Sequence, residues 1–331
     1  MGLCCPCRRS LTTGCLFTGL ARSLSGGLCW FPYAGYFRAL FRNEMVVAEK
    51  IDKRWRFSYW RDALRFVKRA LLSRCTTTLA GHQFELAYEA RHVREFADYL
   101  FLTRCARDRR CVLDVGANVG ATSLLMAREL AAGGQLFAFE PSEASCLIIR
   151  ENALLNRLDE PIEIVNALVA DSSNRIETFF WNFVSTRSNA VMSRENESIP
   201  LVKPTLTLDS FCSSAQVTPD FIKIDVEGAE GRVVAGMTQL LAEARPLVYV
   251  ELHAWPGAPV GENAANILRC VLPHHYGMYH LRSRQFVREA ETHFSKVDPP
   301  KNSIHSQARV LLIPNESAPP PWLGDMDTSN L

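Results

Sequence analysis

The chain has 331 residues, of which 47% are hydrophobic and 22% are charged. This length and composition are typical of a globular protein with one substantial core and additional segments at its ends. The formal net charge is only +2, which excludes the strongly basic balance typical of nucleic-acid-binding domains. The sequence contains no uninterrupted run of 18 apolar residues, so we expect no membrane-spanning helix.

Residues 1–45 are predicted to form a leader that is separate from the main domain of the chain. The first 43 residues contain five arginines and no acidic residue, and five of the 11 cysteines precede residue 30. Cys4-x-x-Cys7 has no further ligand at zinc spacing, which argues against a metal site. We expect a disordered extension, with a targeting or lipid-anchored segment as the alternative. A cytoplasmic location is expected, with membrane or organelle association through residues 1–45 left open.

Residues 46–104 are predicted to form a basic helical cap. Nine Lys or Arg residues lie between Lys50 and Arg74, and apolar residues recur at helical spacing at Trp60, Leu64, Val67 and Leu71. This pattern predicts a basic amphipathic helix. Such a helix packs on a neighbouring domain or lies on an anionic membrane surface, and we favour the packed cap. A second helix is predicted from Phe84 to Arg104.

The catalytic domain is predicted over residues 105–314, and it opens with a strand, a glycine turn and a helix. Cys111–Val115 is apolar except for Asp114, and helix formers follow Gly120. Glycine permits a positive φ and the close approach of a ligand. The spacing from Gly116 to Gly120 differs from the G-x-G-x-x-G pattern of dinucleotide-binding folds. It is similar to the D/E-x-G-x-G-x-G loop of S-adenosylmethionine-dependent methyltransferases, with Asn118 in place of the middle glycine.

A second predicted strand ends in Glu140, 20 residues after Gly120. A carboxylate at a strand tip can accept hydrogen bonds from both hydroxyls of a ribose.

Other segments of the chain also give expectations. The segment Ser172–Pro200 predicts a hairpin and a lid, His274 and His275 are expected in a turn, and residues 315–331 are expected to be a flexible tail. Further strands separated by helix-length segments indicate a doubly wound α/β sheet: Ile162–Asn166, Phe221–Asp225, Leu247–Glu251, Gly277–Leu281 and Ala308–Ile313.

Charged residues gather near the ends of the later strands. Strand alternation puts Lys223 and Asp225 on one face, and a buried lysine needs a partner, for which Glu251 on the next strand is the candidate. Ligands bind at the carboxyl ends of strands in open α/β sheets, so these residues are expected at the rim that holds Asp114 and Glu140. The alternative for Lys223 and Glu251 is a salt-bridge network that fixes the strand ends. The candidate catalytic residues are Asp225, His253, Glu227, Lys223 and Glu251.

The motifs DVGANVG, FEPS, TLTLDSF, FIKIDVEGAE and VYVELH occur in this order over about residues 90–255. In this order they resemble the FkbM family of S-adenosylmethionine-dependent methyltransferases. The resemblance implies a class I, Rossmann-like sheet of seven mostly parallel strands, S-adenosylmethionine as cofactor, and methyl transfer to a hydroxyl of a sugar or secondary metabolite. It also implies a cofactor site in which Asp114, Gly116, Asn118 and Gly120 surround the methionine part, Glu140 binds the ribose, and Asn166 and Ala167 lie near the adenine.

Two mechanisms remain open for an alcohol acceptor. Asp225 or His253 could remove the hydroxyl proton, and histidine has the more suitable ordinary pKa. Asp225, Glu227 and Glu251 could instead hold a divalent cation, although metal-free catalysis is favoured.

The alternatives to a methyltransferase are a noncatalytic cofactor-binding scaffold tethered by its N-terminus and an NAD(P)-dependent oxidoreductase. The oxidoreductase requires a G-x-G-x-x-G loop that the sequence lacks. The expected partner is a small hydroxylated acceptor and not a nucleic acid. The N-terminal region is the candidate for peripheral membrane contact.

Overall fold

The computed structural model describes residues 74–87, 90–93, 96–181, 199–254, 259–295 and 307–328. All of these residues belong to one compact unit, Ile51–Leu331. The leader over residues 1–45 and the basic amphipathic helix expected before residue 74 lie outside the described residues, so both stay predictions.

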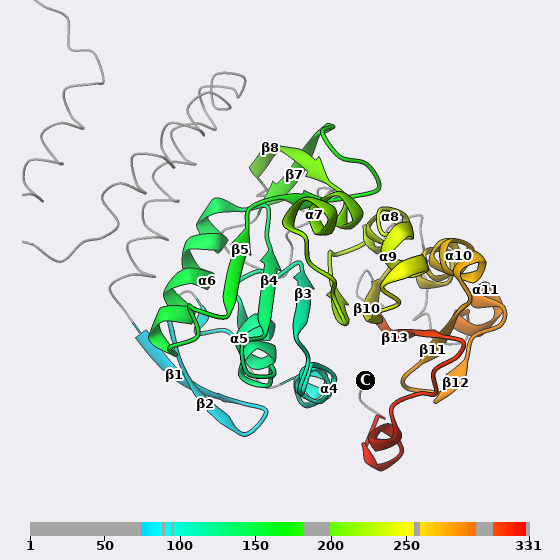
Figure 1. The fold of residues 1–331 in the computed structure, drawn as a ribbon, viewed down its shortest axis with the longest axis horizontal. Helices are drawn as coiled ribbons and strands as arrows, with labels where there is room; N and C mark the ends of the chain where they lie inside the picture. Colours follow the sequence, from blue (N-terminus) through cyan, green and yellow to red (C-terminus); the bar gives the residue numbers. More distant parts are fainter. Residues whose placement is uncertain are drawn as a thin grey trace, which may run out of the picture. The chain divides into compact units, whose positions relative to one another are not determined.

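The central element is a sheet of eight strands in the order β12-β11-β13-β10-β9-β3-β4-β5 (Figure 1). The five strands from β10 to β5 are parallel, and β13, β11 and β12 pair antiparallel. This order confirms the predicted doubly wound, mostly parallel sheet, to which β12 adds a two-residue edge strand. The bounds are β3 Cys111–Val115, β4 Gln135–Phe139, β5 Ile162–Val165, β9 Phe221–Ile224, β10 Leu247–His253, β11 Tyr276–His280, β12 Gln285–Phe286 and β13 Gln307–Pro314.

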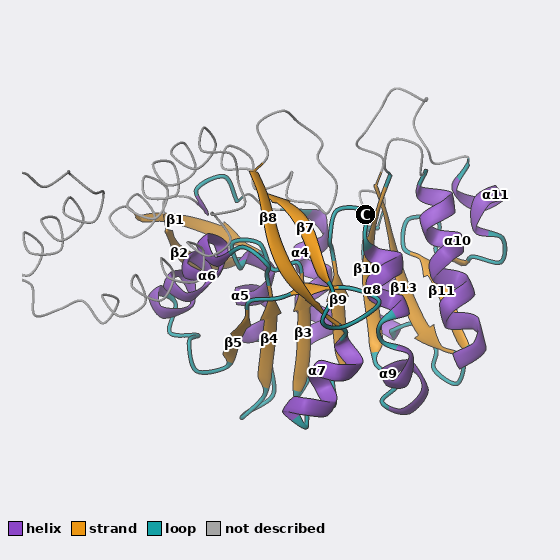
Figure 2. Ribbon diagram, turned by 90° about the horizontal axis from the view of Figure 1, so that it is seen from above, coloured by secondary structure: helices purple, strands orange, loops and turns teal. Residues whose placement is uncertain are grey.

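Helices cover both faces of the sheet. One layer contains α4 (Ala97–Ala106), α5 (Ala121–Arg128) and α6 (Glu143–Leu155). The other contains α7 (Leu208–Ala215), α8 (Glu230–Ala235), α9 (Thr238–Glu243) and α10 (Val260–Val271), which lie in front of the sheet in Figure 2. A short helix, α11 (Ala290–Phe294), packs on α10. Burial on both faces explains why β3 and β9 are almost continuously apolar.

An apolar core lies between the sheet and the layer of α7 to α10. Alternate residues of the central strands point into it, among them Leu113, Ile222, Ile224 and Val250. The intervening positions of the same strands include Asp114 and Lys223, which are also buried. One face of the sheet is therefore apolar, whereas the other face carries charged groups that need partners.

The helix predicted from Phe84 to Arg104 is wrong in its first part. Arg74–Leu79 (β1) and His82–Ala87 (β2) form an antiparallel hairpin, and helix α4 begins only at Ala97. The turn between the strands has positive φ at Ala80 and Gly81. Two asparagines at the carboxyl end of α6 then bind β2: Asn152 accepts from the Ala87 amide at 2.7 Å, and Asn156, the C-cap residue after the helix, contacts the backbone of Glu85. These long-range contacts favour the strand over the helix.

A second, three-stranded sheet lies over the carboxyl end of the central sheet (Figure 1). It contains β6 (Leu168–Val169), β7 (Ile176–Trp181) and β8 (Ile199–Leu206), with β7 and β8 antiparallel. Arg232 of α8 fixes this sheet through Glu177 at 2.6 Å and Asp171 at 2.7 Å. The predicted hairpin is confirmed, and the predicted lid over residues 182–198 lies outside the described residues.

The segment after β13 was expected to be a flexible tail, and this prediction is wrong for residues 315–328. Pro321–Asp325 forms a 3-10 helix, η4. The Trp322 ring lies 5.4 Å from that of Phe101, and Leu323 is 3% exposed. The apolar side chains in this Pro-rich segment bury enough surface to order it. The turn predicted at His274 and His275 is confirmed by a 3-10 helix, η3 (Leu272–His274), followed by His275 at φ 58°.

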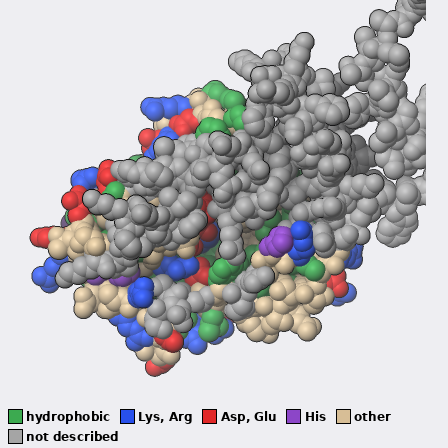
Figure 3. All heavy atoms as spheres, turned by 180° about the vertical axis from the view of Figure 1, so that it is seen from behind, with side chains coloured by type: hydrophobic (Ala, Val, Ile, Leu, Met, Phe, Trp, Pro, Cys, Tyr) green, Lys and Arg blue, Asp and Glu red, His purple; other side chains and the backbone are tan. Residues whose placement is uncertain are grey.

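The described surface is mixed in character. On the face in Figure 3, basic and acidic side chains are interspersed over the described residues. Among the described residues, the large exposed apolar side chains include Phe96 and Leu100 at the start of α4, and Leu154, Ile176, Leu272 and Phe286 on other elements. Among the residues that the structure describes, no helix has the length and apolar character needed to cross a bilayer.

The packing of η4 is testable by a pair of adjacent substitutions. Leu323→Ala removes a buried side chain and is expected to lower the free energy of unfolding by about 2–4 kcal/mol. Gly324→Ala is the control, because an added Cβ meets no atom within 4 Å. Urea denaturation measures both variants. Equal stabilities of the two variants would show that this segment contributes no packing.

Candidate active site

The loop between β3 and α5 is shaped by a close approach of two backbones. Gly116 has φ +81°, and a Cβ added there would lie 1.9 Å from the carbonyl oxygen of Asp225. Gly120 has φ +84° and precedes the first residue of α5, while Asn118 has φ 54°. The amides of Gly116 and Ala117 both donate to the carbonyl of Phe139 at 3.0 Å. Glycine at 116 is therefore required by contact with the chain after β9 as well as by the turn.

Glu140 lies at the end of β4 and is held by this loop. Its Oε2 accepts a hydrogen bond from the amide of Asn118 at 3.0 Å, and its Oε1 accepts one from the amide of Ser142 at 2.9 Å. Burial raises the pKa of Glu140 to about 7, although both backbone hydrogen bonds lower it. Each carboxylate oxygen retains a second lone pair, so the group can still accept hydrogen bonds from a ligand.

An open cleft lies beside the loop at the carboxyl ends of the strands. Six predicted site residues line it: Gly116, Asn118, Glu140, Ala167, Asp225 and Glu227. The sequence interpretation did not identify its apolar wall, which includes Phe139, Leu168, Val169, Phe179 and Val226. The alternation of β7, in which Ile176 is exposed and Phe179 is buried, is a signal that could have identified Phe179.

Asp114 lies beneath the loop and does not line the cleft. It is fully buried, and Oδ2 accepts hydrogen bonds from the hydroxyls of Thr122 at 2.8 Å and Ser123 at 2.6 Å. Asn166 also acts through a neighbour, because its side-chain amide donates to the carbonyl of Glu140 at 2.9 Å. Gly120 packs against Ile149 of α6. Asp114, Asn166 and Gly120 were predicted to bind the cofactor. In the structure they support the loop and the end of β4 and do not line the cleft.

The predicted pairing of Lys223 with Glu251 is wrong. Lys223 Nζ lies 3.0 Å from Asp114 and 3.4 Å from Asp225, and it donates to the carbonyl of Gly116 at 3.1 Å. The register explains this choice, because Asp114 on β3 and Tyr249 on β10 flank Lys223, and Glu251 lies two residues beyond. Burial lowers the pKa of Lys223, but the charges of Asp114 and Asp225 raise it above its ordinary value. Lys223 therefore stays charged.

Glu251 belongs to a separate buried network behind the sheet. Arg309 of β13 donates to Glu251 at 3.2 Å and lies 3.7 Å from Asp98 of α4. The hydroxyl of Tyr249 donates to Asp98 at 3.1 Å. Burial, followed by the negative charge of Asp225, raises the pKa of Glu251 to about 8. Glu251 was predicted either to act in catalysis or to belong to a salt-bridge network that fixes the strand ends, and this geometry favours the salt-bridge network.

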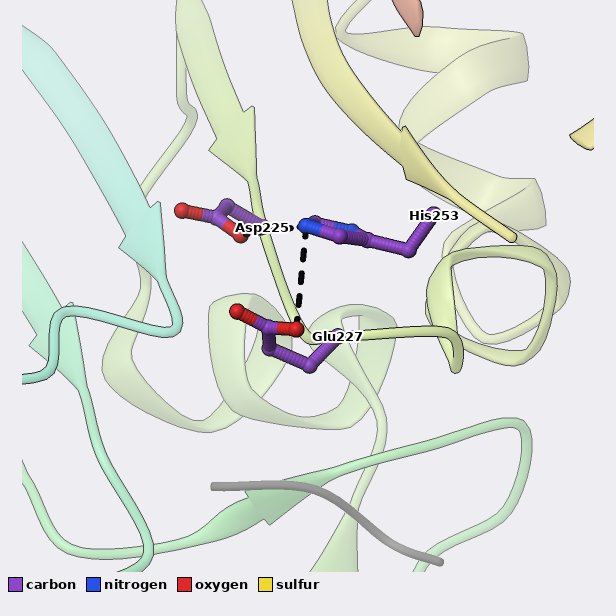
Figure 4. A group of neighbouring side chains, drawn as sticks. All are labelled: Asp225, Glu227 and His253. Carbon is purple, nitrogen blue, oxygen red and sulfur yellow. Dashed lines mark ion pairs between the residues drawn. The ribbon is translucent and has the colours of Figure 1, made fainter. Parts of the chain in front are cut away.

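His253 stands among three carboxylates. Its Nδ1 lies 2.8 Å from Glu230, and its Nε2 lies 3.8 Å from both Asp225 and Glu227 (Figure 4). Burial lowers the pKa of His253, but the hydrogen bond to Glu230 and the three negative charges outweigh burial and raise it to about 10. In the metal-free protein the imidazole is therefore protonated at neutral pH, and it is unsuited to act as a general base.

The methyltransferase FkbM domain family matches residues 114–291. This match covers more than half of the chain, so the chain belongs to this family. It is 28% identical over 155 residues to the 2-O-methyltransferase NoeI of Sinorhizobium fredii (strain NBRC 101917 / NGR234). The aligned part covers 42% of this chain and 62% of NoeI, so the chain spans less than two thirds of that relative.

Two solved structures are similar over most of the chain. An O-methyltransferase from Bacillus cereus in complex with SAH has 15% sequence identity and a TM-score of 0.39, covering 81% of this chain and 96% of its own. Methyltransferase FkbM from Methylobacillus flagellatus KT has 12% identity and a TM-score of 0.38, covering 89% and 70%. Family membership confirms the resemblance, the methyltransferase class of the domain and S-adenosylmethionine as its cofactor. It favours the methyltransferase over the oxidoreductase alternative.

The close approach at Gly116 gives a prediction with a matched control. Gly133→Ala places alanine at φ +73° in open space and is expected to cost about 1–2 kcal/mol. Gly116→Ala adds a backbone collision to the same strain, so a loss of at least about 3 kcal/mol in unfolding free energy is expected. Urea denaturation compares the two. Equal losses would mean that the contact with Asp225 does not constrain position 116.

The charge of His253 gives a prediction on pH. In the metal-free protein its imidazole is expected to remain protonated from pH 6 to 9 in NMR titrations, and Glu230→Gln is expected to lower its pKa. The pKa of His253 in the folded chain lies above the ordinary histidine value of 6.5. The resulting stabilisation is therefore complete below pH 6.5 and is lost as the pH rises toward 10. A wild-type titration midpoint near 6.5 would contradict this arrangement.

Proposed function

We propose that this chain is an S-adenosylmethionine-dependent O-methyltransferase whose acceptor is a hydroxyl of a sugar or a similarly hydroxylated small molecule. Membership of the FkbM family supports methyl transfer. The similarity to a 2-O-methyltransferase supports oxygen as the acceptor atom. The observation that carries the proposal is the cleft itself, which has Glu140 on one strand end and the carboxylates of Asp225 and Glu227 on another.

The residues of the cleft fit S-adenosylmethionine. Glu140 offers acceptor positions for the vicinal hydroxyls of a ribose. The apolar wall of Phe139, Leu168 and Val169 offers a surface for a purine ring. The backbone at Gly116 borders the cleft, where it can contact the amino-acid part of the cofactor.

The carboxylates of the cleft support methyl transfer to a hydroxyl group. S-adenosylmethionine supplies a methyl group that is already activated by its sulfonium charge. The chain has to orient a hydroxyl toward that methyl group, exclude competing water and accept a proton. Asp225 and Glu227 are acceptors that reach the cleft, and Lys223 places a compensating positive charge 3.4 Å from Asp225. We assign proton acceptance to these carboxylates and not to His253.

Calorimetric titration tests the cofactor part of the proposal. At pH 8 the wild-type protein is expected to bind S-adenosylmethionine and S-adenosylhomocysteine, and Glu140→Ala is expected to bind at least about tenfold more weakly. Glu163→Ala, on the exposed side of the neighbouring strand β5, is the control and should bind normally. Because the pKa of Glu140 is about 7, wild-type affinity should fall from pH 8 to pH 6 as the carboxylate is protonated.

Transfer of a labelled methyl group tests the acceptor part. Wild-type protein incubated with methyl-labelled cofactor is expected to label hydroxylated glycosides as alkali-stable ethers, and Glu140→Ala is expected to lose this activity in parallel with cofactor affinity. Failure of folded wild-type protein to bind either cofactor form would overturn the methyltransferase proposal. Label found only on amines would overturn O-methylation.

A further inference from the structure

Three side chains with metal-binding atoms converge beside the cleft. His253 ends β10, and Asp225 and Glu227 follow β9 on the loop to α8 (Figure 4). One nitrogen or oxygen atom from each lies within 4.8 Å of the other two. Two carboxylates and one imidazole form a mixed ligand set that suits divalent transition-metal ions.

The distances among these groups are too long for direct hydrogen bonds. His253 Nε2 is 3.8 Å from Asp225 Oδ1 and 3.8 Å from Glu227 Oε2, whereas N–H···O bonds span about 2.7–3.2 Å. Bound transition-metal ions lie about 2.0–2.2 Å from nitrogen and oxygen ligands, so an ion between two such atoms separates them by roughly 3–4 Å. The observed spacing matches atoms that share an ion better than atoms that share a proton.

The orientation of His253 is fixed by a second layer of contacts. The residue is 3% exposed, and its Nδ1 is 2.8 Å from Glu230, which is fully buried. Glu230 in turn accepts hydrogen bonds from Asn263 at 2.6 Å and from the amide of Gly228 at 2.9 Å. The ring therefore directs Nε2 at the two carboxylates. A carboxylate that binds the remote nitrogen of a histidine is the arrangement that orients metal-binding histidines.

The cluster is buried on the histidine side and open on the carboxylate side. The His253 side chain is 4% exposed, whereas those of Asp225 and Glu227 are 29% and 19% exposed. Both carboxylates also line the cleft. An ion held here would have protein ligands on one side and free coordination positions on the side of the cleft.

We propose that Asp225, Glu227 and His253 bind a divalent transition-metal ion, for which Mn²⁺ is the probe, and that the acceptor's hydroxyl oxygen completes its coordination. The role in the reaction rests on the proposed function, whereas ion binding itself does not. A hydroxyl bound to the ion releases its proton to a carboxylate or to solvent more easily. Its oxygen then forms the new C–O bond as the C–S bond breaks, and the electron pair of the broken bond stays on sulfur.

This ligand set differs from the one considered from the sequence. Glu251 was the third ligand of the cation site considered as the alternative, but Arg309 donates to it at 3.2 Å. In the proposed site His253 takes this third position. The proposal thus departs from the metal-free mechanism favoured from the sequence, because only the folded arrangement brings these three residues together.

Mn²⁺ binding to the full-length, chelator-treated protein tests the inference. Electron paramagnetic resonance of free Mn²⁺ is expected to show one saturable site per chain, with affinity at least about tenfold weaker in Asp225→Asn and in Glu227→Gln. Glu251→Gln is the matched control, since it removes a nearby carboxylate charge outside the cluster, and it should bind like wild type. Pulsed resonance of the wild-type complex should show nitrogen coupling from one imidazole, which His253→Gln removes.

The outcomes separate this inference from the proposed function. Absence of a saturable site, wild-type affinity for Mn²⁺ in Asp225→Asn and Glu227→Gln, or a complex without imidazole coupling would overturn the metal site. Methyl transfer that is unchanged in excess chelator would overturn the role of the ion in the reaction, although the methyltransferase proposal would then stand. Specific Mn²⁺ binding in a protein that binds no S-adenosylmethionine would overturn the proposed function and leave the site intact.

Discussion

A charged lysine inside a sheet that is covered on both faces is the constraint on which the rest of the site depends. Lys223 is 2% exposed, and an ammonium group at that depth is stable only when its charge and its donors are matched. Asp114 on the adjacent strand supplies the charge at 3.0 Å, and the carbonyl of Gly116 accepts a further hydrogen bond. Because breaking a buried pair leaves an uncompensated charge, β3 and β9 are held in one register.

The same pair determines the shape of the loop that follows β3. Asp114 also accepts hydrogen bonds from Thr122 and Ser123 in the first turn of α5, so strand and helix are held at both ends of the turn. The turn can then pass close to the carbonyl of Asp225, where only glycine fits at position 116. Asp114, the carboxylate of the DVGANVG motif, is therefore buried and stabilises the loop, whereas Glu140 faces the cleft.

The sequence predicted the features that have local causes and missed those set by distant neighbours. Periodicity and glycine spacing were sufficient for the order of strands and for the loop around Gly116. The hairpin Arg74–Ala87 was missed because the contacts that favour it come from Asn152 and Asn156, more than 60 residues away. Alternation placed Lys223 on the correct face, but the choice between Asp114 and Glu251 depends on register across two strands, which the sequence does not encode locally.

The cleft combines two groups of acids whose environments differ in kind. Glu140 is bound by two backbone amides and is desolvated, so its proton affinity is raised and a ligand's hydroxyl groups can replace water around it. Asp225 and Glu227 are more exposed and face a histidine that is locked by Glu230. A carboxylate that binds hydroxyl groups gains from a dry site, whereas carboxylates that hold an ion with free coordination positions gain from access to the cleft. Lys223 acts on a carboxylate of each group, because it lies 3.4 Å from Asp225 and its charge also lowers the pKa of Glu140.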